Sequence, residues 1–318
     1  MAYSAGDTIL DDEYNAFVGN SSSPYGYNHF AGTGSGVYGL NQSSISTVSA
    51  GGTVQASQWN SLFTGLDNIA NHTNVSITAS SVSAGDTVAI RSALITDLAN
   101  LAAAVAGGST SATALDAAAS VGSSTNAGTW NSTSTIERSV TFANNATMRA
   151  FFNAGGFIRI DPSCVTGIAG SKDTVFNDLT VTATGNLDLK AHSTTRSGAG
   201  ETLTTNGLAN GFHDLGTGYT VLLKLTSDNS GYTSDTVEYS AKLNAAVSSA
   251  TVLTVKMVSS DPAADTTYTS PNTSGVPANP NEAPRMTLAL LASNPNNTQG
   301  LAAGITSSSN AQVSNSAS

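Results

Sequence analysis

The chain has 318 residues, enough for one large or two ordinary domains. Only 10% of its residues are charged, against about 25% in an average soluble protein, and Ser, Thr, Asn, Ala and Gly are abundant instead. The formal net charge is −10, and the eleven Lys and Arg residues are scattered between residues 91 and 285. Proteins that bind nucleic acids cluster their basic residues, so this distribution excludes a nucleic-acid partner.

The chain also lacks the sequence features of disulfide-bonded, secreted and membrane-spanning proteins. Cys164 is the single cysteine, which rules out an intrachain disulfide and a Cys-based zinc site. The N-terminus lacks the basic and then apolar run of a secretory signal, and no segment approaches the ~20 apolar residues of a membrane span. We therefore expect synthesis in a cytoplasm and no membrane partner.

One short phrase, Ser-Ala-Gly-(Asp/Gly)-Thr-(Ile/Val), occurs three times, at residues 4–9, 49–54 and 83–88. Each copy is predicted to form a turn, a short extended piece and a helix with one apolar face. None is large enough to bury that face alone, so the faces must cover each other, another domain or a neighbouring subunit. The copies therefore predict a docking and oligomerisation module over residues 1–107.

The helices of the first two copies align residue by residue. Asp11 or Asp12 is expected to cap the first helix, and Ser57 the second. Tyr14-Asn15 then falls on Trp59-Asn60. The expected apolar faces are Tyr14, Phe17 and Val18 in the first helix and Trp59, Leu62, Phe63, Leu66 and Ile69 in the second.

The third copy leads into the strongest helical pattern of the chain, over residues 88–106. Its apolar stripe is narrow, like a coiled-coil seam, and consists of Leu94, Leu98, Leu101 and Val105. This copy has Ala93-Leu94 where the other two have an aromatic residue and Asn. We predict that Leu98 is buried at a contact between subunits or between the repeated copies, with no ligand role.

The segment that joins the first two copies, residues 20–43, is rich in glycine and aromatic residues. Gly32, Gly34 and Gly36 suggest a phosphate-binding loop, but no basic residue occurs in the first 90 positions and no helical pattern follows. A packed loop is the better interpretation. Its aromatic residues are expected to pack the loop onto the rest of the protein or onto a partner. They are Tyr25, Tyr27, Phe30 and Tyr38.

The rest of the chain reads as linker, β-domain and tail. Residues 108–137 are rich in Ser, Thr, Ala and Gly and are predicted to be a linker, anchored by Trp130. Residues 138–295 are predicted to form an antiparallel β-sandwich-like domain, with a short helix capped by Asn144 or Asn145. Residues 296–318 form a polar tail, expected to order only against a partner. The predicted fold is mainly β with short N-terminal helices.

No constellation of residues predicts catalysis, a cofactor or a metal. His29, His72, His192 and His213 are far apart in sequence, and His213-Asp214 is the best local pair. Cys164 has no adjacent base in the sequence. Asp11-Asp12-Glu13 lacks the pattern of a calcium loop and suits helix capping better. The sequence does not exclude a pair of carboxylates for sugar hydrolysis, because such a pair can converge from distant strands.

Three stretches carry a resemblance: SAGDTILDDEYNAFVG, SAGGTVQASQWNSLF followed by LDNIANHT, and ATMRAFFNAGGFIRI. Together they resemble the virion structural proteins of tailed bacteriophages, particularly those of marine phages that infect cyanobacteria. The resemblance covers the first 75 residues and about residues 139–160. It implies a component of the neck, tail, fibre or head surface, with no catalytic residues to carry over.

The expected function is therefore that of a non-enzymatic virion structural protein, an oligomeric tail or neck appendage or connector attached through its N-terminal module. Expected partners are copies of the chain itself, as a trimer or higher ring, and other virion proteins. One alternative is a head-surface decoration protein. Another is an adhesin that binds host surface sugar, for which Tyr219, Tyr232 and Tyr268 are the candidate aromatic residues. An enzyme such as a depolymerase is disfavoured.

Overall fold

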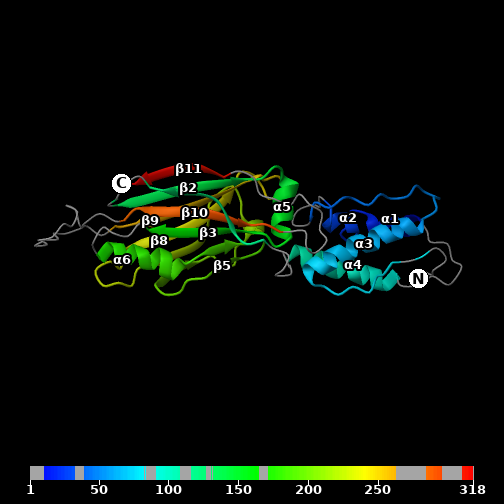
Figure 1. Ribbon diagram of the computed structural model, residues 1–318, viewed down its shortest axis with the longest axis horizontal. Coiled ribbons are helices and arrows are strands. Elements are labelled where there is room, and N and C mark those ends of the chain that lie inside the picture. The colour runs from blue at the N-terminus through cyan, green and yellow to red at the C-terminus, as the bar shows by residue number, and fades with distance from the viewer. Residues whose placement is uncertain are drawn as a thin grey trace, which may run out of the picture. The chain divides into compact units, whose positions relative to one another are not determined.

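In the computed structural model the chain forms two compact units (Figure 1). Unit 1 comprises Met1–Ala117, Ala143–Gly156 and Asn294–Thr306, and unit 2 comprises Ala118–Phe142, Phe157–Ser293 and Ser307–Ser318. The structure describes residues 11–32, 39–81, 83, 91–107, 116–126, 130, 132–164, 171–262, 284–295 and 310–317, with the backbone alone at 91, 171 and 310–317.

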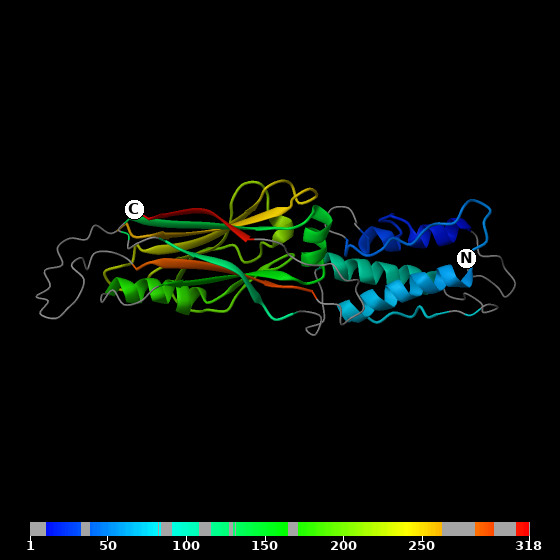
Figure 2. The same ribbon diagram turned by 45° about the horizontal axis from the view of Figure 1, so that its top comes forward.

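Unit 1 is helical in its described part. Its helices are α1 (Asp11–Val18), α2 (Tyr27–Phe30), α3 (Ala56–Thr73), α4 (Arg91–Ala106) and α5 (Asn145–Asn153). The longest two, α3 and α4, lie side by side in both views (Figures 1 and 2).

The helix ends follow local rules of capping. The acidic residues Asp11 to Glu13 occupy the first turn of α1, where the positive end of the helix dipole favours them. The predicted cap of α3, Ser57, is wrong: the N-cap is Gln55, two residues earlier, and its N–H donates a hydrogen bond to the Gln58 side chain at 2.8 Å. The cap of α5 is confirmed as Asn144, whose Oδ1 accepts from the Thr147 N–H at 2.8 Å.

The second Ser-Ala-Gly copy forms the expected turn. The Gly52 N–H donates to the Ser49 carbonyl at 2.8 Å, and Gly51 has a φ of 74°, which is strained for any residue with a Cβ. Residues 4–9 of the first copy and 84–88 of the third lie outside the described residues.

The equivalent aromatic residues of the first two copies meet in the core of unit 1. The Tyr14 and Trp59 rings pack edge to face with centroids 5.4 Å apart, and Phe17 and Phe63 also contact Trp59, at 6.0 and 5.7 Å. The predicted stripe of α4 is buried in the same chain, because α4 packs against α2 and α3. Leu98 is 1% exposed, so its predicted burial is confirmed, and packing within one chain suffices to produce it.

Unit 2 contains two packed antiparallel sheets. The five-stranded sheet has the order β1-β10-β3-β4-β5, and the six-stranded sheet has the order β11-β2-β9-β8-β7-β6. The first sheet consists of β1 (Ala119–Thr125), β3 (Phe157–Cys164), β4 (Leu187–Leu189), β5 (Thr194–Arg196) and β10 (Met286–Ser293). The second consists of β2 (Thr133–Thr141), β6 (Thr202–Asn206), β7 (Thr220–Thr226), β8 (Thr236–Leu243), β9 (Val252–Ser260) and β11 (Asn310–Ala317).

The core of unit 2 comes from the alternating apolar residues of these strands. The inward residues of β9, for example, are Leu253, Val255 and Met257, and they are almost fully buried. Trp130 is confirmed as an anchor: it is 2% exposed, its indole N–H donates to the Pro284 carbonyl at 2.7 Å, and its ring packs on Phe176.

One segment of the predicted β-domain is helical. Residues 174–184 lie in α6 (Ser171–Asn177) and a following π-helical turn, η2 (Asp178–Thr184). The buried residues Val175, Phe176, Leu179 and Ala183 recur with helical spacing, which the run of β-branched Thr and Val residues obscured. With helix at about 30% and strand at about 31%, the fold is mixed α/β and not mainly β.

Three predicted boundaries also change. The predicted linker 108–137 contains all of β1 and the start of β2, because an edge strand pairs through its backbone and needs few apolar side chains. The predicted β-domain 138–295 is interrupted by residues 143–156, which belong to unit 1. The described part of the polar tail forms β11, which pairs antiparallel with β2 of the same chain, so this part is ordered without a partner chain.

None of the described helices has both the length and the apolar character needed to cross a membrane.

Candidate docking groove

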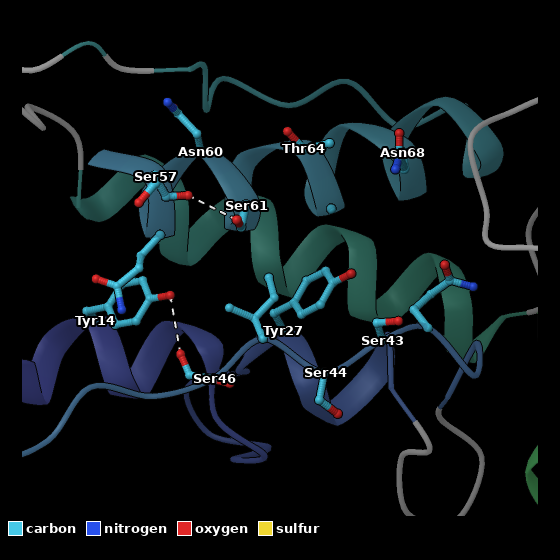
Figure 3. Close-up of a pocket in the computed structure, with 14 residues that line it drawn as sticks. Tyr14, Tyr27, Ser43, Ser44, Ser46, Ser57, Asn60, Ser61, Thr64 and Asn68 are labelled. Atoms are coloured by element: carbon cyan, nitrogen blue, oxygen red, sulfur yellow. Dashed lines mark hydrogen bonds between the residues drawn. The ribbon is translucent and has the colours of Figure 1, made fainter. Parts of the chain in front are cut away.

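Unit 1 contains an open groove between α3 and the extended segment that precedes the second Ser-Ala-Gly copy (Figure 3). We call residues 42–48 the first lead-in segment and the cavity the α3 groove. The groove has a volume of about 910 Å³, and every side chain that lines it is uncharged. Hydroxyl and amide groups predominate.

One wall is a polar stripe along α3. It consists of Ser57, Ser61, Thr64 and Asn68, spaced by four, three and four residues. These positions share one helix face, while the apolar face with Leu62 and Leu66 is turned into the core. The amphipathic pattern of α3 therefore builds both the core and the groove wall.

Two tyrosines lie between the walls of the groove (Figure 3). The Tyr14 hydroxyl donates to the Ser46 carbonyl at 3.5 Å. Tyr27 is 5% exposed, and burial raises the pKa of its hydroxyl to about 12. That hydroxyl has no hydrogen-bond partner among the described residues. Gly65 makes room for the ring, since a Cβ there would stand 2.7 Å from it.

The other wall, the first lead-in segment, is held from behind by two asparagine amides. Asn28 donates to the Ile45 carbonyl at 2.8 Å and accepts from the Ile45 N–H at 2.9 Å. Asn15 makes the same pair of bonds with Val48, at 2.9 and 2.8 Å. Each side-chain amide thus makes with one residue the two backbone hydrogen bonds that a neighbouring strand would make.

The first lead-in segment keeps unused backbone groups. The N–H groups of Ser43, Ser44, Ser46 and Thr47 donate to no described residue. The segment is extended and largely exposed (Figure 3). Successive N–H groups of an extended chain point to opposite sides, so those of Ser44 and Ser46, opposite the Ile45 N–H that Asn28 binds, form an unpaired strand edge.

A second extended segment precedes the third copy, and we call residues 75–81 the second lead-in segment. The carboxylate of Asp97 on α4, 3% exposed, accepts from the Thr78 N–H at 3.0 Å and the Ala79 N–H at 2.8 Å. A smaller hollow of about 450 Å³ lies between this segment and α3. The backbone N–H groups of Ser76 and Ile77 donate to no described residue.

The four histidines and the cysteine weighed for chemistry are buried or partly buried in the described part of the chain. His72 is fully buried and its Nε2 lies 2.8 Å from the Ala154 carbonyl. Burial lowers its pKa, against the opposing effect of that hydrogen bond. His29 Nδ1 lies 3.1 Å from the Asn20 carbonyl. Burial raises the pKa of Cys164 to about 11, which is opposite to the shift that activates a nucleophilic thiol.

His192 and His213, distant in sequence, are brought together in unit 2. Their rings stack with centroids 4.8 Å apart, and burial lowers the pKa of His192. Asp214 Oδ2 accepts from the Gly211 N–H at 2.8 Å, which caps a short 3₁₀ turn, η3 (Phe212–Asp214). Among the described residues, no group of three His, Cys, Asp or Glu side chains is arranged to hold a metal ion.

The two candidate sugar-binding aromatics that the structure describes, Tyr219 and Tyr232, are both partly buried. The Tyr219 ring is covered by Lys242 and Lys256, whose Nζ atoms lie 4.4 and 3.9 Å from its centroid. The third candidate, Tyr268, lies outside the described residues. The same holds for three residues of the glycine-rich loop, Gly34, Gly36 and Tyr38. Tyr232 is half-buried.

Sequence reasoning missed the α3 groove. Its signals were the polar stripe of α3 and the two hydroxyl-rich segments before Ser-Ala-Gly copies, but only the fold shows that the first segment faces the stripe. No protein family, curated protein or solved structure matches this chain.

Proposed function

We propose that this chain is a non-enzymatic virion structural protein of a tailed bacteriophage, an oligomeric tail or neck appendage or connector that attaches through unit 1. The proposal is supported by one observation above all. The repeated module that resembles phage virion proteins carries an uncharged groove with an unpaired strand edge as one wall. Such an edge is a site for pairing with another protein chain.

The chemistry of unit 2 is compatible with this role. Its two antiparallel sheets are packed together, and the chain carries few charges, so its surface relies on hydroxyl and amide groups. Under the proposal, unit 1 attaches the protein to the particle and unit 2 packs or projects.

Electron microscopy of purified particles tests the proposal. A peptide tag inserted in the full chain at Ser249, an exposed turn residue of unit 2, would mark each copy for antibody labelling. We expect label at the tail or neck with rotational symmetry. Label over the head surface would support a decoration protein instead, and a chain found only free in the lysate would refute both roles.

A further inference from the structure

The two lead-in segments are alike in sequence and in environment. Each precedes a Ser-Ala-Gly copy, and each contains a Ser-Ile-(Ser/Thr) triplet, at residues 44–46 and 76–78. In each, polar side chains from the helices bind part of the backbone, and other N–H groups donate to no described residue. Each segment also borders a hollow beside α3. A single chain therefore carries two unpaired extended edges.

The chemistry of the α3 groove favours an extended polypeptide as its occupant. No charged side chain lines the groove, which disfavours a phosphorylated, acidic or basic ligand. Its two aromatic residues are at least 95% buried and offer no open ring face for stacking on a sugar. The unpaired backbone of the first lead-in segment and the unpartnered Tyr27 hydroxyl instead offer main-chain hydrogen bonds.

We propose that the occupant is the second lead-in segment of another copy of this chain, added as a strand beside the first lead-in segment. The donor is uncharged, hydroxyl-rich and already extended, so it matches the groove and loses little conformational entropy on binding. The pairing joins two different surfaces, one from each copy, and is therefore head-to-tail. Repeated around an axis, this pairing closes a ring. It is then the contact between subunits in the oligomer of the proposed function.

A proline substitution tests the pairing. Ser44→Pro removes a backbone N–H that no described residue uses, so unit 1 should fold while strand addition is blocked. Ser44→Ala is the matched control, because it keeps that N–H. In light scattering across a range of concentrations, we expect the parent and Ser44→Ala to associate and Ser44→Pro to remain monomeric. Circular dichroism and the tryptophan fluorescence of the monomer check folding.

Chemical cross-linking tests the partner surfaces. In a Cys164→Ser background, single variants Ser44→Cys and Ser76→Cys are mixed and treated with a short bifunctional maleimide. We expect a covalent dimer in the mixture and not in either variant alone. Ser249→Cys mixed with Ser44→Cys is the control and should give no dimer. Dimers from Ser44→Cys alone would show two-fold pairing and overturn the head-to-tail arrangement.

This inference rests on the proposed oligomeric role, but the two can fail separately. A monomeric parent, or a Ser44→Pro variant that associates like the parent, refutes the strand pairing. If the chain is then still found in particles at the tail or neck, the proposed function survives without this contact. If the pairing is confirmed and the chain is absent from particles, the virion role is wrong.

Discussion

Replacing Leu98 by Ala tests whether α4 belongs to the core of a single chain. Leu98 is 1% exposed, whereas Ile95 on the same helix is 36% exposed. The substitution removes three side-chain carbons, worth about 2.4 kcal/mol at ~0.8 kcal/mol each. The cavity left behind adds to this, so we expect the free energy of unfolding to fall by about 2–5 kcal/mol.

Urea denaturation followed by tryptophan fluorescence measures this loss, because Trp59 lies in unit 1 and Trp130 in unit 2. In a Trp130→Phe background the signal reports unit 1 alone. Leu98→Ala should shift the midpoint to lower urea with an unchanged slope. The control Ile95→Ala should change the free energy of unfolding by less than about 1 kcal/mol, since its side chain is largely solvated.

Two results would refute the reasoning. Equal losses in the Leu98 and Ile95 variants would mean that α4 is not oriented as described. A difference between Leu98→Ala and its parent that depends on protein concentration would mean that Leu98 is buried between subunits, since only association makes stability depend on concentration.

Further predictions concern the groove and its supports. Gly65→Ala should destabilise unit 1 by about 1–3 kcal/mol, because the methyl group would overlap the Tyr27 ring. In urea titrations, the stability loss of the Gly65→Ala, Tyr27→Ala double variant should be smaller than the sum of the two single losses. Asn28→Ala should lower the free energy of unfolding by about 1–3 kcal/mol. It should also speed hydrogen exchange at the Ile45 N–H, because no other described group accepts a hydrogen bond from it. Unchanged exchange would mean that Asn28 does not hold the first lead-in segment. Burial lowers the pKa of His72 in the folded state, so the unfolded chain binds the proton more readily, and the stability of unit 1 should fall as the pH drops below about 6.5. His72→Gln should reduce that slope, and an identical slope would assign it to other groups.

Local sequence determined the elements whose apolar residues recur with a clear period. β8 alternates apolar and polar residues, and β7, β9 and β10 are short runs rich in apolar residues. The stripes of α3 and α4 recur every three or four residues, so both kinds of element were predictable. Turn and cap chemistry was also local, as at Gly51 and Asn144. These features depend on residues within one turn or one hairpin of each other.

Tertiary structure decided what depends on contacts between distant residues. β1 and β11 carry few apolar residues. They are strands only because the backbones of β10 and β2 pair with them. Residues 143–156 lie between strands of unit 2 in the sequence, yet His72 and Gly39 bond to Ala154 and Asn153 within unit 1. The α3 groove likewise exists because Asn15 and Asn28 hold an extended segment opposite a polar helix face, and hydrophobic periodicity carries no information about such side-chain hydrogen bonds.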